Sequence, residues 1–331
     1  MRLIKPLLGL ALLVGLVSLT NIELLLKQFL GADLLLFTCA LVLAVVANVL
    51  CTWRWQKVIK LLGRSTPFNR LLSAYAQGIS VNAVLPGGIV GGDAWRSLLV
   101  SQLLQAPERQ ESSGLGSSKG ASPHFAPLAV QSVLLDRVAG FWALVCLSLL
   151  AGVVALPTAG LTVGLNHHWI NGTAGPSYLW VLALIFAAPF VGRLVYQRWL
   201  HQTVGSQIKS WSGSAREVIN ALPILVASLP ISMITQVVTA TAFWLCLASV
   251  GVAVPWLLLT SLCAGVFLSG ILPASIGGFG ARELGAVAFI TPFGFPTEGV
   301  LAGSILFGLT AIIQGLGGLW FWFEGQRGRS H

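Results

Sequence analysis

Long apolar runs alternate with short polar segments along the whole chain. Six of these runs are close to the ~20 residues that a helix needs to cross a hydrocarbon layer about 30 Å thick. They occupy residues 4–20, 33–52, 130–156, 178–196, 222–250 and 299–323. The first run resembles a signal peptide, but no small-x-small cleavage site follows it, which favours an uncleaved span. The pattern predicts an all-α polytopic membrane protein with about six spanning helices.

Two further apolar stretches, 72–96 and 258–291, are each interrupted by proline and glycine. The expected turn residues are Pro86, Gly87, Gly88, Gly91 and Gly92 in the first stretch, and Pro273, Gly277, Gly278 and Gly280 in the second. Lipid cannot satisfy the backbone groups that a broken helix leaves unpaired, so such turns need surrounding protein or water. We therefore interpret both stretches as re-entrant helical hairpins that border a cavity.

The two interrupted stretches resemble each other. Leu85-Pro86, Gly91-Gly92 and Arg96 match Leu272-Pro273, Gly277-Gly278 and Arg282 with a gap of one residue, although glycine-rich turns can also match by chance. Each half, 1–156 and 178–324, contains two spans, a hairpin and a further span, in opposite orientations. An inverted repeat of this kind is typical of transporters, with the substrate site near the midplane of the membrane.

Charge distribution predicts the orientation. Only 9% of residues are charged and 56% are hydrophobic, which excludes an ordinary soluble domain. Apart from three arginines placed at membrane depth, fifteen of the remaining sixteen Lys and Arg residues fall on the side of the N-terminus, and only Lys27 falls on the other. The positive-inside rule then places both termini in the cytoplasm of a bacterial cell, with the chain in its cytoplasmic (inner) membrane. The net charge of +9 thus reflects topology, with anionic lipid headgroups as a secondary partner and no nucleic acid.

Residues 105–127 are rich in Ser, Gly and Pro, which predicts a flexible cytoplasmic linker between the first hairpin and the third span. The five cysteines contain no CxxC pair, and the adjacent His167 and His168 fit a surface loop better than a metal site. No zinc spacing, P-loop or dinucleotide fingerprint occurs. We expect no metal, no cofactor, no catalytic residues and no soluble-type enzymatic activity.

Three acid-base couples lie at predicted membrane depth, where each ionisable side chain costs about 2.5 to 3.5 kcal/mol on insertion scales. The couples are Asp93 with Arg96, Asp136 with Arg137, and Arg282 with Glu283. Spacing of i, i+3 lets the first couple pair locally, whereas sequence neighbours diverge by about 100° around a helix and should find partners on other elements.

Two interpretations of these charges remain open. A neutral network could simply hold the hairpins against the third span. Alternatively, the guanidinium groups bind a lipid phosphate while the glycine-rich turns expose backbone N–H groups to it. Asn82, just before the first turn, either caps the broken helix or hydrogen-bonds a headgroup.

Three segments in order, NAVLPGGIVGGDAWR (82–96), SVLLDRVAG (132–140) and LPASIGGFGARE (272–283), resemble the lysylphosphatidylglycerol synthase transmembrane region, also called the flippase-like domain family. The resemblance covers almost the entire chain and implies a free-standing member without the synthase domain. It places Asp93, Arg96, Asp136, Arg137, Arg282 and Glu283 at the motif positions of the family. It does not carry over the identity of the substrate.

The first functional hypothesis is a lipid flippase or scramblase for a phosphate-bearing lipid, bound between the two hairpins. The candidate lipids are an anionic or aminoacylated phospholipid, a polyprenyl-linked lipid or a hopanoid-related lipid. One alternative is a non-catalytic scaffold of a lipid-modifying or envelope-biogenesis complex, with a second copy or an envelope enzyme as partner. It would use small-residue faces for assembly, such as that of the last span, which consists of Ser304, Gly308, Ala311 and Gly315. The other is an integral-membrane transferase for lipid-linked substrates, against which the absence of a DxxD acidic cluster argues.

Overall fold

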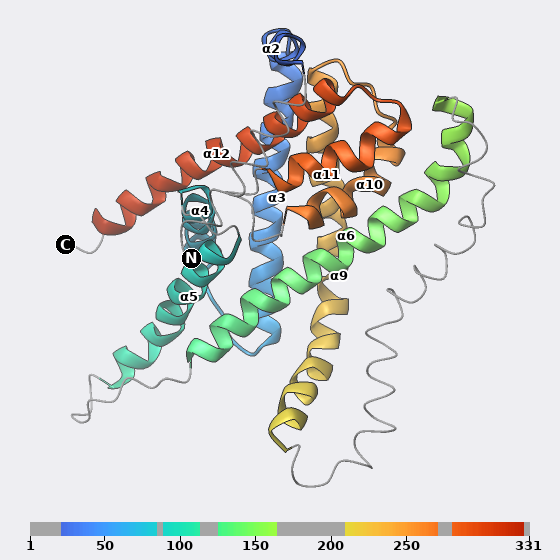
Figure 1. Ribbon diagram of the computed structural model, residues 1–331. Helices are drawn as coiled ribbons and strands as arrows, with labels where there is room; N and C mark the ends of the chain where they lie inside the picture. Colours follow the sequence, from blue (N-terminus) through green and yellow to red (C-terminus); the bar gives the residue numbers. More distant parts are fainter. Residues whose placement is uncertain (1–20, 85–88, 113–124, 164–208, 271–279, 328–331) are drawn as a thin grey trace.

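The computed structural model describes residues 21–84, 89–112, 125–163, 209–270 and 280–327. Every regular element in these ranges is a helix, which confirms the all-α prediction (Figure 1). Four helices contain segments long and apolar enough to cross a membrane, and they correspond to four predicted spans. These helices are α3 (Leu34–Leu61), α6 (Phe125–Val163), α9 (Lys209–Ser249) and α12 (Thr297–Arg327). The predicted spans 4–20 and 178–196 lie outside the described residues.

Helices α3 and α9 are antiparallel neighbours at the centre of the molecule (Figure 1). Asp33 caps α3 by accepting from the backbone N–H of Leu35 at 2.8 Å, and its own N–H donates to the Ser249 carbonyl at the end of α9, also at 2.8 Å. Toward the other end, Lys57 Nζ donates to the Ala227 carbonyl at 2.7 Å. A short helix, α2 (Ile22–Leu30), precedes α3 and packs against α12.

Both interrupted stretches form pairs of packed helices. The first pair is α4 (Phe68–Val84) with α5 (Ile89–Ser112), and the second is α10 (Trp256–Ser269) with α11 (Ala281–Ile290), which a 3₁₀-helix (Thr291–Phe293) follows. At about 1.5 Å per residue, α4, α10 and α11 are roughly 26, 21 and 15 Å long, shorter than a hydrocarbon layer. Helices this short fit a segment that enters the membrane and turns back, whereas α5, with 24 residues, is long enough to cross. Re-entry itself stays a prediction.

The first turn is shorter than predicted. Gly91 and Gly92 belong to the first helical turn of α5, because the Gly92 N–H donates to Asn82 Oδ1 at 2.7 Å and a Cβ there would collide with the Gly78 carbonyl of α4. Gly280 does end a turn, since it precedes α11 with a φ of 96° that favours glycine. The other predicted turn residues, Pro86, Gly87, Gly88, Pro273, Gly277 and Gly278, lie outside the described residues.

The predicted linker 105–127 is helical at both ends. Helix α5 continues to Ser112, since this segment contains the good helix formers Glu108, Arg109 and Gln110, and α6 already begins at Phe125. Residues 113–124 lie outside the described part of the chain. The linker is therefore at most about half of its predicted length.

Helix packing follows a reciprocal scheme. Helix α4 of the first pair packs against α12, and α10 of the second pair packs against α6. Likewise α5 packs against α6, and α11 against α12. The helices correspond in pairs: α3 to α9, α4 to α10, α5 to α11 and α6 to α12. When each helix is replaced by its counterpart, every one of these contacts becomes another contact of the same set. This is the arrangement that an inverted repeat predicts.

Glycines bring α12 and α4 into close contact. A Cβ on Gly318 would collide with the Ala76 carbonyl and the Ser80 hydroxyl, and Ser80 Oγ donates to the Gly315 carbonyl at 2.6 Å. Gly317, one residue earlier in the same helix, faces open space. The small-residue face of the last span thus serves contact between helices of one chain.

Gly318→Ala should lower stability by about 1 to 3 kcal/mol, because the added methyl group forces the two backbones apart. Thermal unfolding of the detergent-purified protein measures this as a lower transition temperature. Gly317→Ala is the matched control and should leave the transition unchanged or slightly raised, since alanine is the better helix former. Equal transitions for the two variants would contradict the close packing of α4 on α12.

Candidate functional site

Five ionisable side chains from three helices form one ion cluster. Arg54 comes from α3, Asp93 and Arg96 from α5, and Asp136 and Arg137 from α6. We call this set the arginine cluster. It lies where α5 packs against α6 and where α3 contacts α6.

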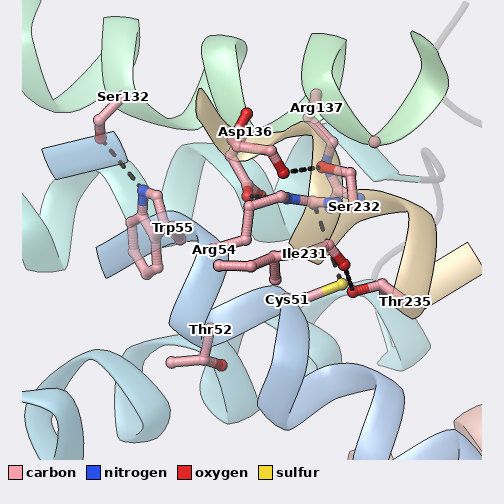
Figure 2. A network of polar contacts seen from close by, with 12 residues as sticks. Cys51, Thr52, Arg54, Trp55, Ser132, Asp136, Arg137, Ile231, Ser232 and Thr235 are labelled. Atoms are coloured by element: carbon pink, nitrogen blue, oxygen red, sulfur yellow. Dashed lines mark hydrogen bonds and ion pairs between the residues drawn. The ribbon is translucent and has the colours of Figure 1, made fainter. Parts of the chain in front are cut away.

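Asp136 is the buried centre of the cluster. Its side chain is fully buried, and its two oxygens accept from different helices: Arg54 Nε donates at 2.8 Å and Arg96 Nη2 at 3.2 Å. Figure 2 shows Arg54 directed from α3 toward Asp136 on α6, with Ser232 and Thr235 of α9 nearby. One carboxylate therefore ties three helices together, which agrees with the prediction that its partners lie on other elements.

Arg96 is held between two aromatic rings. Its Cζ lies 4.2 Å from the centroid of Trp55 on α3 and 4.3 Å from that of Tyr75 on α4, which are cation–π distances. The Trp55 indole in turn donates to Ser132 Oγ on α6 at 3.2 Å (Figure 2). Glycine at position 78 leaves room for the Arg96 stem, since a Cβ there would lie 2.8 Å from its Cγ. Arg96 is 2% exposed and held from all sides.

Arg137 and Asp93 form the accessible end of the cluster. Arg137 Nε donates to Asp93 Oδ2 at 2.8 Å and Nη2 donates to Oδ1 at 2.7 Å, a bidentate pair. The side chains are 27% and 18% exposed, respectively, whereas Arg96 and Asp136 are buried. Arg96 Nη1 also contacts Asp93 Oδ1 at 3.3 Å, as the i, i+3 spacing predicted.

The arginine cluster carries a formal excess of one positive charge, because three guanidinium groups share two carboxylates. Arg54 Nη1 and Arg96 Nε are buried donors that have no hydrogen-bond partner among the described residues. Buried N–H groups of this kind normally have a partner. Charge and unused donors both favour binding of an anion.

Arg282 and Glu283 form a separate pair at the start of α11. Arg282 Nη2 donates to Glu283 Oε1 at 2.5 Å, so the prediction that these sequence neighbours would pair only with other elements is wrong. The reason is the capping of the helix: Glu283 Oε2 accepts from the Gly280 N–H at 2.6 Å, which turns the carboxylate back to the helix end within reach of the arginine. Phe307 and Ser304 of α12 line this pair.

The three couples are therefore divided between two places. Two of them join in the arginine cluster, and the third lies among α11 and α12. Asn82 links α4 to α5 through the Gly92 N–H, which is the capping role of the two predicted for it. The two helix pairs are held together mainly through α6 and α12.

Arg54 was missed by the sequence reasoning, which assigned it to the cytoplasmic surface as a topology residue. It is 3% exposed, and its guanidinium lies against Gly140, where a Cβ would lie 3.1 Å from Nη1. The cause is the length of α3, which continues nine residues beyond the predicted span end at residue 52 and keeps Arg54 inside the bundle. The sequence signal that could have indicated a buried Arg54 was the neighbouring Trp55, which is also buried.

Comparison with known families identifies the chain. Residues 4–318 match the sequence model of the family described as "Lysylphosphatidylglycerol synthase TM region". The chain belongs to this family. A segment of 69 residues is also 30% identical to the "UPF0104 membrane protein MJ1595" of Methanocaldococcus jannaschii.

That match covers 21% of this chain and 20% of the archaeal protein, so it spans only about a fifth of the relative. This member of the lysylphosphatidylglycerol synthase transmembrane-region family is thus a membrane protein of a lipid-related family. Within its described residues, no three His, Cys, Asp or Glu side chains gather as metal ligands. The arginine cluster consists of guanidinium groups and carboxylates, with aromatic rings beside them.

Arg54→Gln should lower the free energy of unfolding of this protein by about 3 kcal/mol. This is the lower end of the range for breaking a buried ion pair, because Asp136 remains paired with Arg96. Denaturant or thermal unfolding in detergent measures the loss. Lys60→Gln is the matched control, since Lys60 is exposed in the last turn of the same helix and should change stability little. A surface role for Arg54 would make the two variants equivalent.

Proposed function

We propose that this protein translocates a phosphate-bearing lipid across the bilayer and binds its headgroup at the arginine cluster. The observation that carries the proposal is the excess positive charge of a largely buried cluster with one accessible guanidinium, Arg137. This site lies beside the first helix pair, next to α3 and α6. It differs from the predicted location between the two hairpins, because Arg282 and Glu283 of the second helix pair are not part of the cluster.

Charge balance supports an anionic ligand. An uncompensated charge inside a bundle of apolar helices is costly, whereas a singly charged phosphodiester group brings the cluster to zero. Arginine suits this ligand because its planar guanidinium donates two parallel hydrogen bonds to a phosphate. Lipid phosphodiesters are abundant at the membrane surface, and they carry this charge at neutral pH.

Reciprocal packing of the helices supports transport. Inverted repeats alternate between two arrangements in which one repeat moves against the other around a central site. In this chain, α6 contacts α5 of the first pair and α10 of the second, and α12 contacts α4 of the first pair and α11 of the second. A headgroup bound beside α6 would be next to a helix that contacts both helix pairs, which supports the proposal.

The competing functions have weaker support. A scaffold would use small-residue faces for assembly, yet Ser304 is buried and Gly315 already packs on Ala83 of α4. A transferase would need Asp93 or Asp136 as a base, yet the oxygens of both carboxylates already accept from guanidinium groups. We infer no enzymatic activity, and the candidate partners beyond lipids are a second copy of the chain or an envelope enzyme.

The distribution of basic residues supports an inner-membrane orientation with cytoplasmic termini. Lys57 and Lys60 lie in the last turns of α3 and Arg64 and Arg70 follow them, while Lys27 lies on α2 at the opposite end of α3 (Figure 1). The positive-inside rule then places the end with four basic residues in the cytoplasm. The arginine cluster lies toward that side, since Arg54 comes just before these residues.

Arg137→Gln should reduce lipid translocation at least tenfold, because a phosphate loses its bidentate donor while the buried partners of the cluster stay paired. The assay reconstitutes the full chain in proteoliposomes with headgroup-labelled phospholipids and quenches the outer leaflet with dithionite. Zwitterionic, anionic and aminoacylated lipids are tested in parallel. Equal rates for the variant and the wild type would refute a role of Arg137 in the lipid path.

Arg70→Gln is the matched control for this experiment. It makes the same chemical change at an exposed position in the first turn of α4, outside the ion pairs of the cluster. It should translocate lipid at the wild-type rate. Absence of wild-type activity with every lipid tested would instead favour the scaffold.

A further inference from the structure

The two ends of the arginine cluster differ in how firmly they are held. Asp136 is fully buried, and it accepts from two buried arginines that α3 and α5 hold in place. Asp93 and Arg137 are both partly exposed, and their contact joins α5 to α6 at the accessible end. An incoming anion therefore meets the Asp93 and Arg137 pair first.

Asp93 covers the face of Arg137 that would recognise a phosphate. Its two oxygens accept from Nε and Nη2 at 2.8 and 2.7 Å, which is the side-on geometry that a phosphate also takes. A carboxylate and a phosphate cannot both occupy this edge of the guanidinium. The protein thus carries its own competitor for the ligand.

Asp93 also has a second cation within reach. Oδ1, which accepts from Arg137, lies 3.3 Å from Arg96 Nη1. The neighbouring Nε of Arg96 is a buried donor without a partner among the described residues. When Asp93 leaves Arg137 it can pair fully with Arg96, so the exchange leaves no carboxylate unpaired.

We propose that Asp93 is a built-in competitor that occupies the anion-binding edge of Arg137 and moves to Arg96 when a phosphate group binds. This inference rests on the proposed function only for the identity of the anion as a lipid headgroup. The exchange sets the affinity, because the ligand must displace a carboxylate before it binds. It assigns Asp93 to affinity control and Asp136 to holding the helices together.

The test is anion binding by the purified full chain in detergent, measured by isothermal titration calorimetry. The probes are short-chain phosphatidylglycerol and inorganic phosphate. Asp93→Asn keeps the shape of the side chain but removes its charge, so it should bind about three- to tenfold more tightly than the wild type, as expected for release of a partly exposed ion pair. Arg137→Gln should bind at least tenfold more weakly.

Asp33→Asn is the matched control. It makes the same chemical change at the far end of α3, where Asp33 is an exposed cap and asparagine caps equally well. Its affinity should equal that of the wild type. If Asp93→Asn binds the lipid more tightly but not inorganic phosphate, the ligand is a lipid headgroup. If it binds both probes more tightly, the ligand is the phosphate group itself. Either result supports the exchange.

Asp93→Asn that is folded but binds no more tightly than the wild type overturns the inference. Should that variant fail to fold, Arg137→Lys provides the decision, because it keeps the charge but loses the planar edge. Weaker binding by Arg137→Lys supports recognition at that edge, and unchanged binding overturns it. If translocation depends on Arg137 but Asp93→Asn leaves anion binding unchanged, the exchange is rejected and the transport proposal stands. If anion binding by the variants is as expected but the wild type translocates no lipid, the transport proposal is rejected and the exchange stands.

Discussion

A charged side chain inside an apolar helix bundle must find an opposite charge, and this requirement organises the first half of the protein. Asp136 is surrounded by Arg54 and Arg96, and each pair crosses between helices. Desolvation costs several kcal/mol per ion, so the pairs are tolerated only where their geometry is good. Helices α3, α5 and α6 are consequently tied by directional ion pairs in addition to the apolar core that they share, in which Trp55, Val100 and Val133 are buried together.

Close helix contact is the second constraint, and it makes the cluster possible. Gly78 admits the stem of Arg96, and Gly140 lets the Arg54 guanidinium lie against the backbone of α6. Gly92 allows α5 to approach α4, where Asn82 joins the two helices. Small residues favour packing in lipid, where the hydrophobic effect gives little preference for one helix contact over another.

The two charged places differ in a way that bears on mechanism. Arg282 and Glu283 form a neutral pair that the helix end and Ser304 complete, so all its charge is compensated locally. The arginine cluster keeps a positive excess and an accessible edge. Among the described residues, the excess charge is found in the first half, which is why the proposed ligand site lies there.

The sequence by itself determined the helical class, the four described spans and the position of both interrupted stretches, because run length and hydrophobicity are local properties. It also predicted that the charges of Asp93, Arg96, Asp136 and Arg137 need partners and that Asp136 and Arg137 find different ones, while their depth in the membrane stays a prediction. The family followed from three short motifs. These conclusions need only the period of a helix and the cost of charge in lipid.

Only the tertiary structure decided which charges meet. Arg54 looked like a topology residue, and its place in the cluster depends on how far α3 extends and on which helices flank it. The pairing of Arg282 with Glu283 depends on a carboxylate that turns back to cap its own helix. The pairing of Arg54 could not be derived from spacing, because its partner is chosen by the packing of helices that lie far apart in the chain. The pairing of Arg282 could not be derived either, because it depends on the geometry of the helix end. The sequence shows that a buried charge needs a partner, but not which residue that partner is.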